Sequence, residues 1–378
     1  MFTGTLKCEG HMDTKTAARI FYDWANREGF LVAPLTSTLA STPQEIGQIM
    51  PKSAAGTQIL RAKQVHAVAS NEPLRRVIVF THRATPKSKK QIAMLPTHID
   101  DIEIVYRQGA PSPVGTLSTS PQGSPTFVVH QTASGHHYTC GSSISVGNHR
   151  DAGTLGCLVR DAGGTLFGLT NNHVSASCNF AGVGLPILAP GVWDVVPNGL
   201  PPFTIGFHAK GLTLVTGTPD NVNWQKNTDA AIFRINRPSD VSSYQGDKYD
   251  TPSKVGTFVG NQAVEKVGRT TGHTMGRVIG QLHGSIPVPY SMQIYGFSGQ
   301  VFFEPVYSIA GTGMPFSDHG DSGALITALD EDGTRMAVGL VFGSMTDASA
   351  PGGKVTLALP ILPILEELSV TLVNGHNV

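Results

Sequence analysis

The sequence predicts a mostly β protein with a small α+β module at its N-terminal end. Its 378 residues include 43 glycines and 25 prolines, a content that is typical of many short strands and tight turns. From residue 139 onward, short apolar runs alternate with turn residues, as two packed antiparallel barrels require. At about 150 residues per domain, a chain of this length allows two or three units.

The first 110 residues carry mixed helical and strand patterns. In residues 14–29, apolar side chains such as Ile20 and Phe21 recur among polar ones, which predicts an amphipathic helix. A second short helix is expected to begin at Pro43, because proline suits the first turn of a helix. Three strands should follow, at residues 66–70, 75–82 and 102–106. We therefore expect an N-terminal α+β module over residues 1–110.

Residues 111–138 are expected to form a linker or a surface strap. The tract from Ala110 to Pro125 is rich in proline, serine, glycine and threonine, and it lacks the apolar period that a packed core needs. We expect few contacts to cross this boundary. Residues 139–378 then hold the two barrels and end in a short helix, whose apolar stripe lies in residues 360–368.

The charge pattern argues against nucleic-acid and membrane partners. The chain has 27 basic and 27 acidic residues, and only 14% of its residues are charged. The three lysines in residues 87–90 have no interleaved aromatic residues, which indicates a solvated loop. The N-terminus lacks an apolar segment of the length that a signal peptide needs, and no window of about 18 apolar residues occurs. We therefore expect a cytoplasmic protein.

The run Asp-His-Gly-Asp-Ser-Gly at residues 318–323 places Ser322 in a glycine-flanked turn. A serine hydroxyl is a poor nucleophile alone, so it needs a base, an acid that orients the base, and donors for the oxyanion that forms. Two candidates lie upstream. An apolar strand pattern ends at His173, and Asp229 leads into a second strand. The chain order is therefore His, Asp, Ser.

These three motifs resemble the signatures of the chymotrypsin-fold serine peptidases, namely Thr-x-x-His, Asp-Ala-Ala and Gly-Asp-Ser-Gly, here at residues 170–173, 229–231 and 320–323. Gly-Arg-Thr-Thr-Gly at residues 268–272 resembles a segment of the bacterial secreted members. Residues 143–161 resemble stand-alone bacterial trypsin-like peptidases and the plant narrow-leaf protein. The resemblance implies a chymotrypsin-like double antiparallel β-barrel with serine peptidase activity.

The resemblance also implies roles for single residues. Ser322 would attack the scissile carbonyl, His173 would accept and return its proton, and Asp229 would hold the imidazole. The backbone N–H groups of Gly320 and Ser322 would form the oxyanion hole. With Asp321, which the resemblance places in a structural ion pair, the implied site residues are His173, Asp229, Gly320, Asp321 and Ser322.

In the secreted animal enzymes, a freed N-terminus pairs with the aspartate before the nucleophile, which is Asp321 here. Here the expected catalytic region follows an N-terminal module, so Asp321 needs a different cation as its partner. The resemblance to the bacterial members suggests Lys266, which would form a buried ion pair with Asp321. In the alternative, Lys266 points to solvent and Arg269 or a backbone donor serves Asp321.

The substrate pocket is also placed by the resemblance. Phe316, six residues before the nucleophile, is expected at its floor, and Phe342, Gly343 and Ser344 at its wall. A phenylalanine floor argues against arginine or lysine substrates and favours uncharged side chains of small or medium size. Phe342 is larger than the residue common at that point of the wall.

No cofactor, metal or disulfide framework is expected. The chain has four cysteines, Cys8, Cys140, Cys157 and Cys178, without a Cys-x-x-Cys pair. Free buried thiols are the favoured interpretation, and a pairing of Cys157 with Cys178 stays open. His136 and His137 are adjacent, so on a strand they would point to opposite faces and could not easily ligate one ion.

Two rival enzyme classes fit poorly. An α/β-hydrolase orders its residues Ser, acid, His within Gly-x-Ser-x-Gly, whereas the histidine that follows Ser322 here is His376 in a polar tail. The glycine-rich residues 268–276 lack the Gly-Lys-Ser/Thr ending of a phosphate loop.

The sequence therefore predicts a regulated serine endopeptidase with a specific protein substrate. The N-terminal module is expected to dock a substrate, a regulatory partner or another subunit, and the resemblance allows a role in bacterial defence. The alternative is a binding scaffold of the peptidase fold with incidental or no proteolysis.

Overall fold

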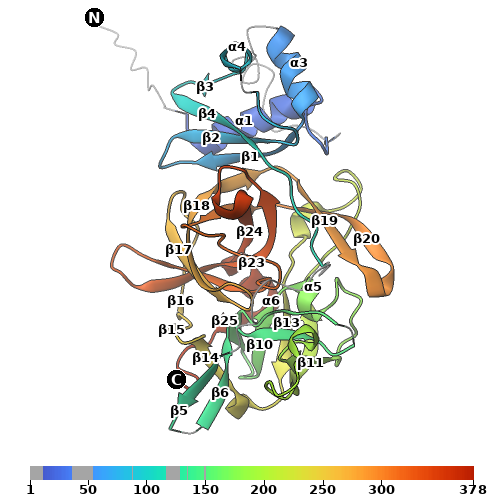
Figure 1. Ribbon diagram of the computed structural model, residues 1–378, viewed down its shortest axis with the longest axis vertical. Helices are drawn as coiled ribbons and strands as arrows, with labels where there is room; N and C mark the ends of the chain where they lie inside the picture. Colours follow the sequence, from blue (N-terminus) through green and yellow to red (C-terminus); the bar gives the residue numbers. More distant parts are fainter. Residues whose placement is uncertain (1–11, 36–53, 87, 116–127, 134, 149) are drawn as a thin grey trace, which may run out of the picture.

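The protein is described by a computed structural model that covers residues 12–35, 54–86, 88–115, 128–133, 135–148 and 150–378. Figure 1 shows three parts stacked along the long axis: the N-terminal module, a barrel in the middle, and a second group of strands at the far end. The expected helix at Pro43 and the residue Cys8 lie outside the described residues.

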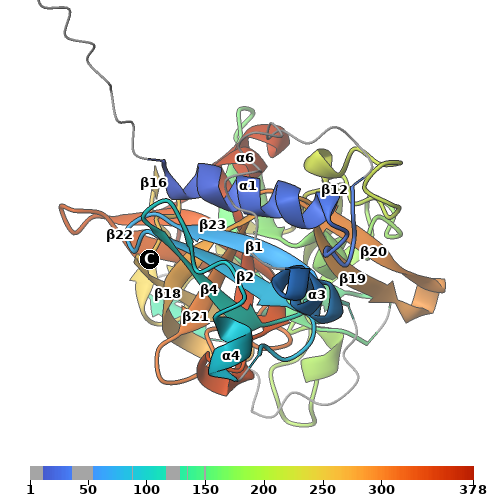
Figure 2. The ribbon, with the colours of Figure 1, turned by 90° about the horizontal axis from the view of Figure 1, so that it is seen from above.

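The N-terminal module is a small sheet covered by helices. Its elements are α1 (Thr14–Arg27), α3 (Ala54–Lys63), β1 (Val65–Asn71), β2 (Arg76–Thr81), α4 (Lys89–Ile92), β3 (His98–Ile99) and β4 (Ile102–Gln108). Asp13 caps α1, because its Oδ1 accepts a hydrogen bond of 2.7 Å from the amide of Thr16. The apolar face of α1 packs on β1 and β2 (Figure 2), as the sequence pattern predicts.

The middle part is a closed barrel. Its strands are β16 (Lys254–Val255), β17 (Ala263–Gly268), β18 (Gly272–His283), β21 (Val306–Gly311), β22 (Leu325–Leu329), β23 (Arg335–Thr346) and β24 (Lys354–Pro360). Strand β17 pairs with both β22 and β18, which closes a six-strand ring. The short β16 adds to β23 in parallel. A two-stranded hairpin, β19 (Ile286–Met292) and β20 (Phe297–Phe303), projects beside the barrel.

The far part consists of two open sheets. One holds β7 (Ser143–Val146), β8 (Gly153–Thr154), β9 (Cys157–Asp161), β10 (Leu166–Thr170), β11 (Pro186–Ala189), β12 (Phe203–Gly211), β13 (Ala231–Ile235) and β25 (Val370–Leu372). The other holds β5 (Val129–Thr132), β6 (Gly135–Cys140), β14 (Val241–Gln245) and β15 (Tyr249–Asp250). The first of the two expected barrels is therefore a half-barrel arrangement rather than a closed ring.

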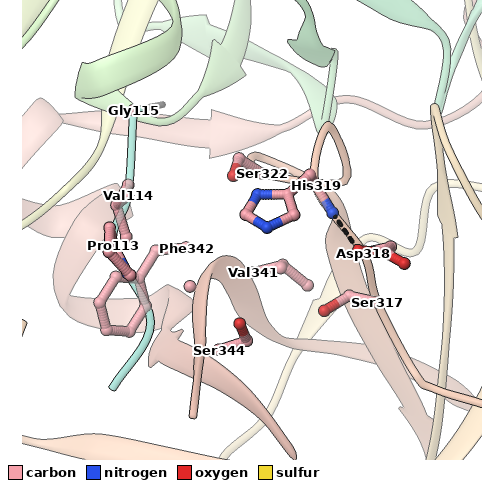
Figure 3. A pocket seen from close by; sticks show the side chains of 11 residues that line it. Pro113, Val114, Gly115, Ser317, Asp318, His319, Ser322, Val341, Phe342 and Ser344 are labelled. Carbon is pink, nitrogen blue, oxygen red and sulfur yellow. Dashed lines mark hydrogen bonds between the residues drawn. The ribbon is translucent and has the colours of Figure 1, made fainter. Parts of the chain in front are cut away.

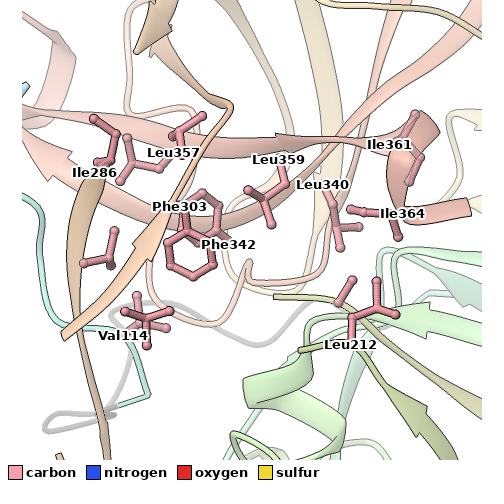
Figure 4. Close-up of a cluster of buried hydrophobic side chains, with 14 of the residues drawn as sticks. Val114, Leu212, Ile286, Phe303, Leu340, Phe342, Leu357, Leu359, Ile361 and Ile364 are labelled. Atoms are coloured by element: carbon pink, nitrogen blue, oxygen red, sulfur yellow. The ribbon is translucent and has the colours of Figure 1, made fainter. Parts of the chain in front are cut away.

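Short helices connect these strands. α5 (Asn172–Ser175) follows β10, and α6 (Ile361–Leu368) follows β24 as the predicted C-terminal helix. Single 3-10 turns lie at Val192–Asp194, Trp224–Lys226, Pro238–Asp240, Gln293–Tyr295 and Pro351–Gly353. Figure 4 shows apolar side chains from the closed barrel, the β19–β20 hairpin, α6 and the segment after β12 meeting in one cluster, which includes Leu340, Phe303, Ile364 and Leu212. This shared core fixes the closed barrel and the far sheets, the two halves between which the cleft lies, against each other.

Strand pairing crosses the boundary at which few contacts were expected. β1 pairs antiparallel with β18 of the closed barrel, with Val68 opposite His283, so the module and the barrel share one 11-stranded sheet. The hairpin β5–β6 also begins at Val129, inside the expected linker over residues 111–138. The sequence missed both features because strand pairing between distant segments leaves no local signal.

Three of the cysteines, Cys140, Cys157 and Cys178, are buried free thiols, so Cys157 and Cys178 do not pair. Burial raises the pKa of the Cys140 thiol to about 12. The side chain of His137 bonds to the backbone oxygen of Ser239 at 2.6 Å, which is a structural role. No helix of the described residues has the length and apolar content needed to span a membrane.

Candidate active site

His173 and Asp229 meet at one end of the half-barrel sheet. β10 pairs with β13, with Thr170 opposite Ala231, so the residues that follow β10 lie beside those that precede β13. The imidazole Nδ1 of His173 lies 2.5 Å from Oδ2 of Asp229, and the amide of His173 donates to Oδ1 at 3.0 Å. Both residues are buried. The carboxylate thus fixes both the backbone and the ring of His173.

Asp229 has a further donor that the sequence did not indicate. The hydroxyl of Tyr290, on β19, donates to Oδ2 of Asp229 at 2.7 Å. Burial, and then the charge of Asp229, raises the pKa of Tyr290 well above its usual range, so the hydroxyl keeps its proton. No motif surrounds Tyr290 in the sequence. Its apolar neighbours predict only a buried strand position.

Ser322 comes from the other half of the molecule. It lies in the turn before β22, and it lines the same cleft as His173, together with Gly320 and His319. No hydrogen bond joins Ser322 to His173 within the described residues, and such bonds are often long before substrate binds. His173 and Ser322 thus line one cleft between the far sheets and the closed barrel, and Asp229 is buried behind His173.

The peptide between His319 and Gly320 is held in one orientation. Thr270 Oγ1 donates to the carbonyl of His319 at 2.5 Å, and Thr154 Oγ1 donates to the carbonyl of Gly320 at 2.8 Å. Because the N–H and C=O of a trans peptide point in opposite directions, the amide of Gly320 faces away from Thr270. Gly320 has φ of +94°, where a side chain would be strained and would clash with Thr270.

The amides of Gly320 and Ser322 donate to no acceptor among the described residues. Two neighbouring N–H groups without acceptors next to a serine hydroxyl are what an oxyanion hole requires. These are the two amides that the resemblance would place in an oxyanion hole.

Asp321 lies within this turn, and its side chain is fully buried. Lys266 Nζ lies 3.2 Å from its Oδ2, and Lys266 is also fully buried, so the predicted ion pair is present. The amide of Thr270 donates to Oδ1 at 2.8 Å, and Thr271 Oγ1 donates to Oδ2 at 2.6 Å. Burial lowers the pKa of Lys266, and the charge of Asp321 opposes that shift.

Arg269 does not pair with Asp321, although the alternative to the Lys266–Asp321 ion pair named it as a possible partner. Its Nε donates to Oδ2 of Asp194 at 2.7 Å, and both side chains are buried. Its Nη1 also donates to Thr270 Oγ1 at 3.0 Å. The segment around Arg269 therefore supports the turn of the nucleophile through two separate ion pairs.

The expected pocket residues separate into two groups. Phe342, Gly343 and Ser344 line a small cavity of about 40 Å³ beside Ser322 (Figure 3). Phe316, which is expected at the pocket floor, does not line this cavity. Its ring is buried in the core of the closed barrel, where it packs against Gly276. Phe316 lies in the loop between β21 and β22, and this loop turns its apolar side chain inward.

The opposite wall of the cavity comes from the expected linker. Pro113, Val114 and Gly115 face Ser322 and His319 across the opening (Figure 3). The negative side chain at the rim, Asp318, is paired with Lys354 at 2.7 Å. The described residues contain no group of three or more His, Cys, Asp or Glu side chains that could hold a metal.

Comparisons with known proteins agree with the recognised motifs. No protein-family model matches the chain. It is 27% identical over 222 residues to Protein NARROW LEAF 1 of Oryza sativa subsp. japonica, a match that covers 54% of this chain and 36% of the rice protein. The chain thus spans about a third of the length of that relative.

The solved structures that are similar to the chain include proteases. Thermobifida fusca Protease A is 20% identical, with a TM-score of 0.40, over 63% of this chain and 98% of that protein. A glutamic acid specific serine protease is 22% identical, with a TM-score of 0.39, over 62% of this chain and 100% of that protein. The closed barrel beside half-barrels, with the cleft between them, is a chymotrypsin-like fold.

Proposed function

We propose that the chain is a serine peptidase. One observation carries the proposal: the coupled pair His173–Asp229 shares a cleft with Ser322, and two amides without acceptors lie beside that serine. A histidine and an aspartate alone would be a common structural pair. The combination with a nucleophile and an oxyanion hole is the arrangement that acyl transfer needs.

The chemistry would follow the triad sequence. Ser322 Oγ attacks the carbonyl carbon while His173 Nε2 takes the hydroxyl proton, and Asp229 stabilises the imidazolium. The oxyanion accepts hydrogen bonds from the amides of Gly320 and Ser322. Collapse of the intermediate breaks the peptide bond, and the amine leaves with the proton from His173. Water then attacks the acyl carbonyl while His173 takes its proton, and His173 returns that proton to Ser322 Oγ as the acid leaves.

We propose a cytoplasmic endopeptidase with one specific protein substrate, in which the N-terminal module docks that substrate, a regulatory partner or another subunit. The small cavity beside Ser322 and the pairing of Asp318 with Lys354 support uncharged side chains of small or medium size at the cleaved position.

A binding scaffold with incidental proteolysis is the second candidate. The observation that favours it is the narrow cleft, where Pro113, Val114 and Gly115 face Ser322. If Ser322→Ala protein retains the full biological effect, the scaffold is the better description, whereas loss of that effect supports the peptidase.

Labelling of the full chain with a fluorophosphonate tests the peptidase directly. The probe should react with Ser322, and His173→Ala should abolish labelling while thermal melting stays near that of the wild type. Ser298→Ala, which changes an exposed serine of β20 that does not line the cavity, is the matched control and should label normally. Labelling of His173→Ala at the wild-type rate would show that His173 is not the base.

A further inference from the structure

The chain that leaves the N-terminal module runs along the edge of β23. We call residues 109–115 the strap. Thr346 donates its amide to the carbonyl of Ala110 at 3.0 Å, and the amide of Ser112 donates to the carbonyl of Ser344 at 2.8 Å. Between these bonds, Pro111 lies opposite Met345 in an antiparallel bridge. The strap is therefore an added strand on the outer part of β23.

The strap is anchored again beyond this pairing. The amide of Val114 donates to the carbonyl of Pro289 at 2.8 Å, and the amide of Ser291 donates to the carbonyl of Val114 at 3.0 Å. The side chain of Val114 is buried in the same core cluster as Phe342. Displacing the strap would break pairings with two strands and expose an apolar side chain, so it is a fixed part of the cleft wall.

The opposite end of the strap is also held. Arg107, just before it, lies 3.0 Å from Asp347, whose side chain is 1% exposed. Removing the arginine would leave this carboxylate buried and without its ion pair, which makes such an anchor costly to break.

An extended peptide commonly binds by adding a strand to an exposed sheet edge. β23 pairs with β22 only as far as Leu340, and its next residues line the cavity beside Ser322. Val341 still bonds through its backbone to Gly323 and Ala324, so the edge after Val341 is where the backbone of a substrate would pair. From Ser344 onward, the strap already occupies it.

The register of the pairing between the strap and β23 shows how much of the β23 edge stays free for a substrate. With Pro111 opposite Met345 and Ser112 bonded to Ser344, the strap residue that would come opposite Phe342 is Val114. Val114 instead bonds to β19, so the strap leaves the edge at Phe342 and Gly343. A substrate thus has room to pair at these two positions only.

We propose that the strap is a specificity determinant that limits the substrate backbone to two residues before the scissile bond. P1 denotes the residue whose carbonyl is attacked, and P2, P3 and P4 precede it. A third residue would have to bond to Ser344, where Ser112 is bound. The chain upstream of P2 therefore turns out of the cleft or ends there, and selection acts on P1, P2 and the residues after the cleaved bond. This inference rests on the proposed peptidase function.

The test uses the full chain and peptidyl phosphonates that react with Ser322. Their P1 residue stays constant and their length grows from P1 alone to P4. For an open edge, each added residue that pairs raises the second-order labelling rate by about two- to tenfold. With the strap in place, we expect a rise at P2 and less than about a twofold change from P2 to P4.

The variant Ser112→Pro removes the amide that bonds to Ser344, and Ser112→Ala, which keeps it, is the matched control. We expect Ser112→Pro to gain about tenfold with the P3 and P4 residues, and Ser112→Ala to match the wild type. A rate that rises at P3 in the wild type overturns the proposal, and so does a series without any gain in Ser112→Pro.

The two levels of inference fail differently. If a simple fluorophosphonate without a peptide does not label Ser322 in the folded protein, the peptidase proposal is wrong. If that probe labels Ser322 but the rate of the peptidyl series rises at P3 and P4, only the role of the strap is wrong.

Discussion

The active site depends on two fully buried aspartates that are stabilised in different ways. Asp229 receives bonds from His173 and from the hydroxyl of Tyr290, and among the described residues no lysine or arginine pairs with it. Asp321 is paired with Lys266, which is itself buried. In the proposed reaction, the first carboxylate would attract the positive charge that forms on His173. The second is neutralised permanently, because it must hold one backbone geometry.

The largest expected effect is the loss of turnover on removing the charge of Asp229. Asp229→Asn keeps the shape of the side chain but removes the charge and favours the wrong imidazole tautomer, so we expect turnover to fall by about 10⁴-fold. Thermal melting should change little compared with that loss. Turnover of a short peptide and a melting curve measure both quantities. Turnover within tenfold of the wild type would show that Asp229 does not orient the base.

Lys266→Met should act on stability first. The variant leaves Asp321 as a buried charge without its ion pair, which typically costs about 3–5 kcal/mol of the free energy of unfolding. Turnover should fall as well, because Asp321 positions the peptide of Gly320. Urea unfolding and turnover of the same preparation test this. A variant with the melting temperature and turnover of the wild type would rule out a supporting role for the pair.

Tyr290→Phe should have a smaller effect and mainly on activity. It removes one hydrogen bond to the charged Asp229, and such bonds contribute about 1.5–3 kcal/mol, so we expect turnover to fall by about ten- to a hundredfold. Tyr295→Phe is the control from the same hairpin region, since Tyr295 accepts a bond from Asn148 rather than contacting the site. Equal turnover of the two variants would mean that the hydroxyl of Tyr290 does not support Asp229.

The smallest effect concerns His283, a buried group to which no carboxylate bonds among the described residues. His283 Nε2 bonds to Ser70 Oγ at 2.7 Å, and burial, followed by the charges of Arg19 and Lys15, lowers the pKa of His283 to about 4, although Asp13 opposes the shift. Below pH 6.5 the unfolded chain therefore binds a proton that the folded chain does not. The free energy of unfolding is therefore unaffected by His283 above pH 6.5, and it decreases as the pH falls from 6.5 toward 4.

At pH 5, this difference amounts to about 2 kcal/mol of the free energy of unfolding. Urea unfolding at pH 7 and pH 5, for the wild type and for His283→Gln, measures it. The variant should lose less stability between the two pH values. An identical loss in both proteins would show that His283 is charged in the folded state.

The sequence predicted the parts of the site that reside in short motifs. The turn around Ser322 carries its glycines within the motif, and Lys266 precedes a recognisable Gly-x-Thr-Thr-Gly segment, so both could be placed in advance. Tyr290 could not, because its link to Asp229 depends on the path of a hairpin 61 residues away. The composition of residues 111–138 predicted a linker or a surface strap, but it did not indicate that Ser112 pairs as a strand residue.

The pairing of β1 with β18 has a consequence for synthesis of the chain. Ser70 and His283 are in contact but are 213 residues apart. At about 5–20 residues per second, β1 emerges some tens of seconds or less before its partner strand exists, and during that time one edge of it has no partner. Such an edge is a site for wrong pairing with other chains. Proteolysis of ribosome-bound chains should cut the β1 region readily when the chain ends before β18 and slowly when β18 has emerged. Equal protection in both would mean that the module completes its sheet without the barrel.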